Sequence, residues 1–444
     1  MTVSRTICSG FLIIIAVGTV LLMLPFSTHN GDWNNPIVAL FTATSAVCVT
    51  GLVVVDTGSY FSPWGQGIVL LLIQLGGLGY MTATTFLLLL LGRRLGLRDR
   101  LAIQQSMDKT ELSGANSLVR SIIATTMIFE ITGVFLMLPI FASDYGYGQS
   151  IWLAIFHSIS AFNNAGFSLF SDSLMQYARS PGMNLIITSL VIIGGIGYQV
   201  IMEVFFWLRD RLQGRQERII FSLHFKIVTS TTLILLGIGS LALLATEFSN
   251  PFTLATEGFG VKVMMAWFQS VIARTAGFNT IDIGSMKNTS LFIVAALMFI
   301  GASPGSTGGG IKTTTVRILM ICTRAVLQGK AEVLCYQRQI PVDRVLKAIA
   351  VVVGSGMMVI GITTLISLTD SNLNFITVLF ESVSAFATVG LSTGITAKLS
   401  TLAKLLLIIT MYVGRVGVLL MMSAILGDPR FSTIHYPEED LLVG

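Results

Sequence analysis

One short pattern occurs four times in this chain: SAVCVTGL at residues 45–52, SAFNNAGF at 160–167, VIARTAGF at 271–278 and SAFATVGL at 384–391. Each copy has a glycine at the same place, and an aromatic residue stands ten positions before each glycine, at Phe41, Phe156, Trp267 and Phe380. Copies of one unit at near-constant spacing are typical of repeats that stack together. We therefore expect one pore domain, 1–444, of four quarters: 1–100, 101–215, 216–330 and 331–444.

The segments around the pattern are apolar enough to lie in a membrane. Hydrophobic residues make up 53% of the 444 residues and charged residues only 11%, whereas a soluble domain carries about 25% charge. Runs long enough to cross about 30 Å of hydrocarbon lie near 7–26, 66–91, 120–142, 183–208, 227–246, 290–324, 346–369 and 402–426. They predict eight spans, one before and one after each copy of the pattern.

The apolar stretch that leads into each glycine is too short to cross the membrane, because a helix of ~11 residues rises only ~16 Å. Non-helical backbone at that depth is tolerated only where it lines a water-filled path or is buried in protein. We predict an all-α integral membrane protein with four tandem M1–pore loop–M2 repeats. Its eight transmembrane helices and four re-entrant pore helices are expected in a pseudo-fourfold arrangement.

The basic residues predict an orientation rather than a nucleic-acid partner. The net charge is +5, and alternate connections carry the lysines and arginines, at Arg93, Arg94, Arg98, Arg100, Lys109, Arg209, Arg211, Arg215, Arg218, Arg324, Lys330, Arg338, Arg344 and Lys347. The connections at 29–35, 143–149, 247–257 and 369–374 contain neither residue type. By the positive-inside rule the basic connections and the N-terminus face the cytoplasm. We therefore expect a multi-pass protein of the cytoplasmic (inner) membrane.

The four glycine loops are predicted to form a cation filter. Glycine reaches positive φ without a Cβ clash, so converging loops can point rings of carbonyl oxygens at a partly dehydrated ion. Short helices whose C-terminal ends face the axis add partial negative charge. The predicted ion-binding carbonyls belong to Val49, Thr50, Gly51, Asn164, Ala165, Gly166, Thr275, Ala276, Gly277, Thr388, Val389 and Gly390.

Glycine in an apolar helix also permits close helix packing. We prefer that interpretation for the glycines in the second spans, namely Gly76, Gly79, Gly194, Gly197 and Gly417. The glycines of the repeated pattern differ from these because each follows a half-length helix and precedes a polar turn.

The second span of the third quarter is interrupted by GASPGSTGGGIK at residues 301–312. Proline removes a backbone donor and each glycine costs ~1 kcal/mol relative to alanine in a helix, so this segment is expected to be unwound, mobile and just inside the filter. The segment formally matches a G-x-S-x-G nucleophile motif, but it lies between membrane helices, and we do not expect an enzyme. We predict a gate formed by Gly305, Ser306, Thr307, Gly308, Gly309, Gly310, Lys312 and Arg415.

Arg415 is the one basic residue in the middle of a predicted span, where a charge costs ~2.5–3.5 kcal/mol and is usually functional. We expect it either to repel cations below the filter or to bind carbonyl groups of the unwound segment at 301–312, which we call the gate segment. A buried ion pair with Glu130 or Glu203 is the alternative.

Three further charged residues flank the predicted filter. Arg274 lies within the third loop and is expected to face away from the ion, against Asp282. Asp56 and Asp282 each follow a pattern glycine by five positions. They either concentrate cations at the outer mouth or are ordinary solvated acids.

The glycine loops, the GSTGGG segment at 305–310 and Arg415 together resemble the Trk/Ktr/HKT superfamily of potassium transporters over essentially the whole chain. The short length is most similar to the bacterial KtrB-type ion-translocating subunits. The resemblance implies potassium uptake driven by the membrane potential, often with sodium as an activator or coupled ion. It also implies a homodimer on a cytoplasmic ring of KtrA-like nucleotide-binding regulatory subunits, with flux controlled by the gate segment and Arg415. Sodium-favouring plant relatives often have serine at the position of Gly51, so glycine in all four loops favours potassium.

The alternative is a secondary transporter of another small solute, with a midplane site formed by broken helices. It predicts interrupted spans in corresponding halves of the chain, whereas only one of the eight predicted spans is broken. We expect no cofactor and no transition-metal site, because the four cysteines lack paired spacing.

Overall fold

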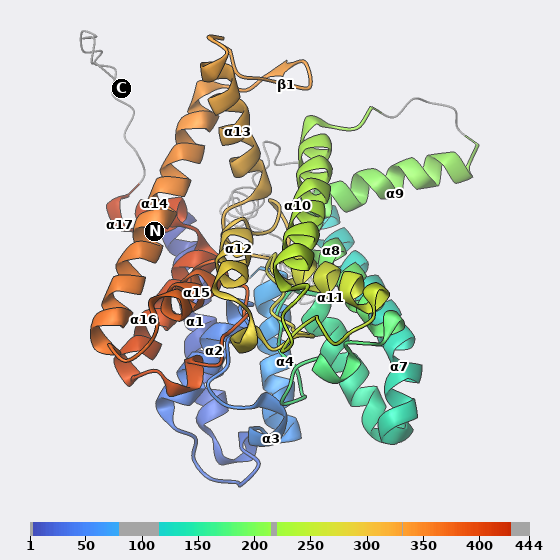
Figure 1. The fold of residues 1–444 in the computed structure, drawn as a ribbon, viewed down its shortest axis with the longest axis vertical. Helices are drawn as coiled ribbons and strands as arrows, with labels where there is room; N and C mark the ends of the chain where they lie inside the picture. Colours follow the sequence, from blue (N-terminus) through green and yellow to red (C-terminus); the bar gives the residue numbers. More distant parts are fainter. Residues whose placement is uncertain (1–2, 80–114, 215–219, 331, 428–444) are drawn as a thin grey trace.

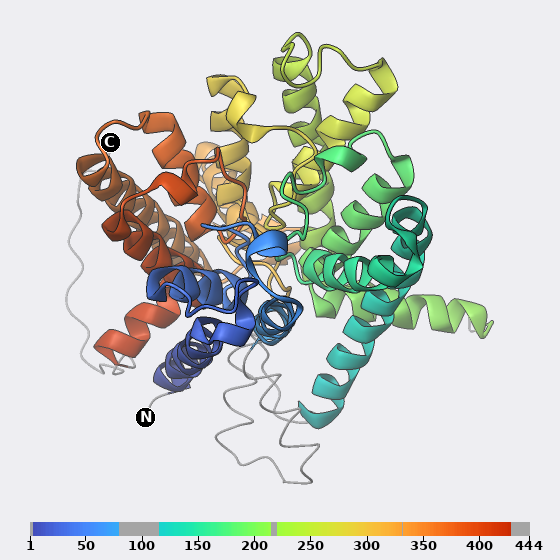
Figure 2. The same ribbon diagram turned by 90° about the horizontal axis from the view of Figure 1, so that it is seen from below.

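Four groups of helices surround a common centre in the computed structural model (Figures 1 and 2). The structure describes residues 3–79, 115–214, 220–330 and 332–427. Seen from the α3 end, the quarters follow one another in sequence order around the centre, from blue through green and yellow to red. The predicted fold class is therefore confirmed. The basic residues at 93–109 and 215–218 and the end of the predicted span 66–91 lie outside the described residues.

Each quarter begins with a long apolar helix. These helices are α1 (Val3–Met23), the first part of α7 (Ala115–Phe162), α10 (Leu223–Glu247) and α14 (Val342–Thr369). All four elements are long and apolar enough to cross a membrane. In α7 the backbone turns at Gly146, where φ is 72°. The spanning helix of the second quarter therefore leads straight into its pore helix.

A short pore helix follows each long helix. The pore helices are α2 (Pro36–Val47), the end of α7, α11 (Phe259–Ile272) and α15 (Phe375–Phe386). The side chain of Asn35 accepts a hydrogen bond from the backbone of Ile37, and Pro36 occupies the first turn. Both features are typical of a helix N-terminus, so α2 begins at a position that the sequence marks.

The aromatic residues of the repeated pattern anchor the pore helices. Phe41, Phe156 and Phe380 are completely buried, as expected for residues that face the core. In the third quarter Trp267 is 36% exposed, and its neighbour Phe268 is buried instead. The buried face of α11 is therefore displaced by one residue from the position that the pattern predicts.

The second helix of each quarter is short or broken. The segments are α4 (Pro63–Gly77), α8 (Pro181–Ile196) with α9 (Tyr198–Leu212), α12 (Asn288–Phe299) with α13 (Thr313–Leu327), and α16 (Thr401–Val416) with α17 (Val418–Leu426). Helices α8 and α9 meet at 104°, and α16 and α17 at 96°. The prediction of continuous spans at 183–208 and 402–426 is wrong, because Gly197 and Gly417 have φ of 96° and 93°, which an α-helix cannot contain.

Short elements form the remaining connections. Five helical turns join the longer helices: η1 (Pro25–Ser27), α3 (Thr57–Tyr60), η2 (Met175–Tyr177), η3 (Ile283–Ser285) and η4 (Thr396–Lys398). An antiparallel hairpin of β1 (Leu334–Cys335) and β2 (Arg338–Gln339) joins α13 to α14. This hairpin and α3 lie at opposite ends of the molecule (Figure 1).

The glycines of the second helices have two different roles. One set lies against backbone carbonyl groups at the ends of pore helices, with no room for a Cβ: Gly76 against Val47, Gly194 against Phe162 and Gly414 against Phe386. Close packing is therefore confirmed for Gly76 and Gly194. Gly79, Gly197 and Gly417 instead have positive φ beyond the ends of helical segments. An added Cβ would meet no atom within 4 Å at Gly79 or Gly417, and at Gly197 it would meet the Pro304 carbonyl group rather than a helix, so the helix-packing interpretation is wrong for them.

This packing predicts that Gly194→Ala destabilises the protein. The new methyl group would overlap the Phe162 carbonyl group, and overpacking of this kind costs about 1–3 kcal/mol. Gly237→Ala is the matched control, because an added Cβ in α10 would meet no atom within 4 Å and alanine is the better helix former by about 1 kcal/mol. Thermal unfolding of the purified protein in detergent should show a lower midpoint for the first variant only. Equal midpoints would contradict the packing.

Candidate functional site

The four glycine loops meet in a closed ring. Each glycine lies against the carbonyl group that precedes the glycine of the next quarter: Gly51 against Ala165, Gly166 against Ala276, Gly277 against Val389 and Gly390 against Thr50. A Cβ at any of these glycines would overlap a backbone atom of the adjacent loop. The segments predicted as filter loops therefore converge on one centre, with carbonyl groups from all four quarters beside it.

Each loop has a second residue in the left-handed region, two positions before the glycine. These residues are Val49 (φ 57°), Asn164 (58°), Thr275 (85°) and Thr388 (51°). Three of the four are β-branched, for which positive φ is a genuine outlier, and such strain persists only where the surroundings over-determine it. Positive φ at the glycines follows from residue type, whereas no sequence signal marks this second position.

Serine hydroxyl groups hold three of the four loops. Each serine stands six residues before its glycine and bonds the backbone of the loop: Ser45 with Gly51 N at 3.1 Å, Ser160 with Phe167 O at 2.8 Å and Ser384 with Gly390 N at 3.1 Å. The third quarter has Val271 at this place, which has no side-chain hydrogen-bonding atom. These serines begin three copies of the sequence pattern, so the pattern itself marks the residues that hold the loops.

The gate segment contacts the ring directly. Gly308 lies against the side chain of Thr275, and Gly309 lies against the side chain of Thr388. The helix of the third quarter is absent between α12 and α13, which confirms that the segment is unwound. Glycine is required at both positions because a Cβ would overlap the threonine hydroxyl groups.

Backbone hydrogen bonds fasten the gate segment to the bent helix of the second quarter. They join Ser303 N to Gly195 O at 3.1 Å, Thr307 N to Gly194 O at 3.2 Å and Tyr198 N to Gly305 O at 3.0 Å. The turn at Gly197 leaves groups at the end of α8 without helical partners, and the gate segment supplies them. The backbone groups left unpaired at the break in the second quarter therefore form hydrogen bonds with those at the break in the third quarter.

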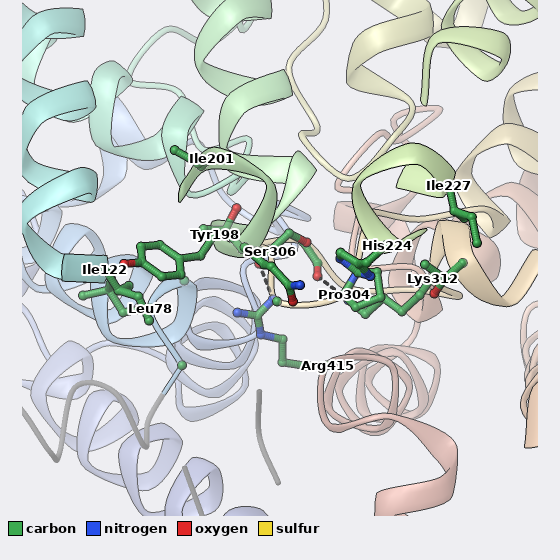
Figure 3. Close-up of a pocket in the computed structure, with 18 of the residues that line it drawn as sticks. Leu78, Ile122, Tyr198, Ile201, His224, Ile227, Pro304, Ser306, Lys312 and Arg415 are labelled. Atoms are coloured by element: carbon green, nitrogen blue, oxygen red, sulfur yellow. Dashed lines mark hydrogen bonds between the residues drawn. The ribbon is translucent and has the colours of Figure 1, made fainter. Parts of the chain in front are cut away.

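Arg415 joins the gate segment to the first quarter (Figure 3). Its guanidinium group donates hydrogen bonds to Thr307 O and Gly76 O. Lys312 Nζ donates to Gly308 O at 2.8 Å. Both cations thus bind backbone carbonyl groups, and of the two interactions expected for Arg415 the structure contains the contact with the gate segment.

The acids considered as partners of this guanidinium group are engaged elsewhere. Glu130 accepts hydrogen bonds from Gln74 Nε2 at 3.2 Å and Asn163 Nδ2 at 2.9 Å. Glu203 accepts from Ser222 Oγ at 2.6 Å. The ion-pair alternative is therefore wrong.

The other predicted charge pair is also absent from the described residues. Arg274 is buried, and its guanidinium group donates to Thr232 Oγ1 of α10 at 3.5 Å. Asp282 instead caps η3, and Asp56 caps α3 in the same way, each accepting a backbone hydrogen bond at 3.0 Å. Arg274 thus reaches the long helix of its own quarter, as expected for a side chain that faces away from the ring, but the pairing with Asp282 is wrong.

A cavity of about 580 Å³ lies on the side of the gate segment that faces β2 and the start of α14 (Figure 3). Arg415, Lys312, Tyr198 and His224 line it, together with residues 304–308 of the gate segment. Residues 77–79 of the first quarter complete the lining from that side. The predicted filter residues do not line this cavity, so the gate segment separates it from the ring.

Comparison with known proteins agrees with this geometry. The family model TrkH, described as a cation transport protein, matches residues 6–427. The chain is 39% identical over 445 residues to Ktr system potassium uptake protein B of Bacillus subtilis (strain 168), covering 100% of this chain and 97% of that protein. It is 35% identical over 448 residues to potassium/sodium uptake protein NtpJ of Enterococcus hirae, covering 99% and 97%. The crystal structure of the potassium transporter TrkH from Vibrio parahaemolyticus has a similar fold, with a TM-score of 0.71 at 20% identity, covering 95% of this chain and 85% of that one.

Proposed function

Because the chain belongs to the TrkH family of cation transport proteins, we propose that it is a multi-pass membrane transporter for potassium uptake, of the Ktr/Trk type. The observation that carries this proposal is the closed ring of four glycine loops. The matched proteins are ion transporters rather than enzymes. In the formal nucleophile motif, the hydroxyl groups of Ser303 and Thr313 share a 3.0 Å hydrogen bond. This contact gives the Ser303 hydroxyl group a structural role.

The ring would select cations through backbone oxygens. A cation that enters exchanges water for carbonyl oxygens from four segments of the chain, and the pore-helix C-termini contribute partial negative charge. The choice between potassium and sodium depends on the spacing and field of those oxygens. Glycine at all four positions lets the loops approach until backbone meets backbone, which supports one fixed spacing.

The gate segment would control passage between the ring and the cavity. It contacts the ring through Gly308 and Gly309 and is fastened by Arg415 and α8. An ion can pass only after the segment moves, and this movement must break the hydrogen bond between Arg415 and Thr307 O. The positive charge of Arg415 also opposes a cation that leaves the ring.

In this proposal the end that carries β1, β2 and the tips of α9 and α13 (Figure 1) faces the cytoplasm, since basic residues gather there. The chain forms one pore domain of four quarters and pairs as a homodimer. A cytoplasmic ring of KtrA-like nucleotide-binding subunits would dock on this end and regulate the gate. Sodium would act as activator or coupled ion, which the name of the Enterococcus hirae relative supports.

A secondary transporter for another solute is the second candidate. The sequence predicted only one broken span, which counted against this candidate. The breaks at Gly197 and Gly417 favour it, because they place interrupted helices in corresponding quarters. However, the break in α8 is filled by the gate segment, and α9 turns outward from the centre (Figure 1). Saturable binding of an organic solute would support this candidate.

The ring predicts that Gly51→Ser and Gly277→Ser lower the preference for potassium over sodium. Each new side chain would push against a neighbouring carbonyl group and change the spacing of the oxygens. Gly148→Ser is the control, because a Cβ there meets no atom within 4 Å. Potassium and sodium uptake should be compared in cells that lack other potassium uptake systems. The same substitution should also be made at Gly166 and Gly390. Unchanged selectivity in all four glycine-to-serine variants would refute the filter.

The gate predicts that deletion of Gly305 to Gly310 increases potassium flux. Arg415→Gln should act in the same direction, because hydrogen bonds from a charged donor are worth about 1.5–3 kcal/mol each, enough to shift a closed–open equilibrium at least about tenfold. Arg415→Lys keeps the charge and should stay closer to the unsubstituted protein. Initial rates of rubidium uptake, normalised to the amount of protein in the membrane, provide the measurement. Rates that stay the same in both the deletion and Arg415→Gln would rule out this gate.

A further inference from the structure

Two ionisable side chains lie behind the ring at the same register in different quarters. His157 stands nine residues before Gly166, and Glu381 stands nine residues before Gly390. They are 0% and 1% exposed. Neither belongs to the predicted filter or gate, so the proposed ion path leaves both unexplained.

Each of these side chains reaches a serine that stands two residues after its glycine. His157 Nε2 lies 3.0 Å from Ser168 Oγ, and Ser392 Oγ donates to Glu381 Oε1 at 2.5 Å. The contact ties the pore helix that enters the ring to the chain that leaves it. We call each such contact a brace.

The brace of the second quarter is fixed in orientation. His157 Nδ1 lies 2.8 Å from Leu153 O, so this ring nitrogen carries the hydrogen. Nε2 is then an acceptor for the Ser168 hydroxyl group, which also lies within 3.2 Å of Ser173 O. The imidazole stacks on Phe170 with 4.9 Å between ring centroids and contacts Phe141 at 5.5 Å. Ser168 Oγ also accepts from Phe170 N at 3.0 Å. One serine therefore links the imidazole to the backbone turn beyond the ring.

The brace of the fourth quarter uses a carboxyl group for the same purpose. Glu381 Oε1 also accepts from Thr393 N at 3.0 Å, and Oε2 accepts from Thr396 Oγ1 at 3.0 Å. The hydroxyl groups of Ser392 and Thr396 lie 2.9 Å apart. Both oxygens of the carboxyl group are thus committed to the turn that follows Gly390.

The other two quarters have different residues at these positions. The corresponding pairs are Thr42 with Val53 in the first quarter and Phe268 with Asn279 in the third. Valine and phenylalanine side chains have no hydrogen-bonding atoms, so neither pair can form a brace. Each glycine contacts the loops of the adjacent quarters, which puts the second and fourth quarters opposite each other. Braces therefore stand on two opposite sides of the ring, in the second and fourth quarters only.

We propose that His157 and Glu381 are positioning residues that set the ion preference of the ring; this inference rests on the proposed potassium transport. Ion choice depends on how well the carbonyl oxygens keep their spacing. A buried hydrogen bond restricts the chain beyond Gly166 and Gly390 to one path. Without the braces the two loops relax, and the ring accepts the smaller sodium ion more readily.

The test compares serine variants that remove one oxygen atom from each brace. Ser168→Ala, Ser392→Ala and the double variant are reconstituted as full-length protein in liposomes, and uptake of radioactive rubidium and sodium is measured in parallel. The ratio of the two rates does not depend on the amount of folded protein. Val53→Ala is the matched control, because it shortens the side chain at the same register in a quarter that cannot form a brace.

We expect the rubidium-to-sodium ratio to fall about three- to tenfold in each serine variant, as for the loss of one buried hydrogen bond, and further in the double variant. His157→Gln and Glu381→Gln retain an accepting oxygen and should keep most of the ratio, whereas His157→Phe and Glu381→Leu should lose it. The control should match the unsubstituted protein.

A double serine variant with an unchanged ratio would overturn the inference, even if its thermal stability were lower, because the contacts would then be structural only. Failure of the proposed function would give a different result. An unsubstituted protein that takes up rubidium and sodium equally would contradict potassium selectivity itself.

Discussion

The contact between each pattern glycine and the carbonyl group of the next quarter is the constraint on which the rest of the structure depends. Gly51, Gly166, Gly277 and Gly390 have no space for a Cβ, so the four loops approach until backbone meets backbone. Closing that ring fixes the ends of the pore helices. The second helices then pack on those ends through their own glycines, as Gly194 does against Phe162.

The second helices of the second and fourth quarters break next to the gate segment. Both α8 and α16 end in a turn of about a right angle, at 104° and 96°. The turn after α8 exposes backbone groups, and the gate segment pairs with them through Ser303, Thr307 and Gly305. Arg415 then joins this segment to the first quarter. The ring, the path of the gate segment and the cavity are consequences of one arrangement.

The sequence predicted the features that depend on residue type and spacing. The pattern glycines, the unwound segment at 301–312 and the contact between Arg415 and carbonyl groups all follow from glycine, proline and charge. The breaks at Gly197 and Gly417 were missed because glycine in an apolar run is compatible with both a packed helix and a turn. The left-handed conformation of Val49 and the polar partners of Glu130 were missed because they depend on neighbours that are distant in sequence. His157 and Glu381 carried a recognisable register, but only the structure connects them with Ser168 and Ser392.

The central claim is that peptide oxygens at the centre of this ring bind a monovalent cation. The most direct measurement is an experimental structure of the full-length protein with thallium in place of potassium, with the metal located by its anomalous scattering. The account predicts a peak on the axis of the ring, coordinated by the carbonyl groups that precede Gly51, Gly166, Gly277 and Gly390. A ring without metal, in a crystal whose thallium binds elsewhere in the membrane region, would contradict it.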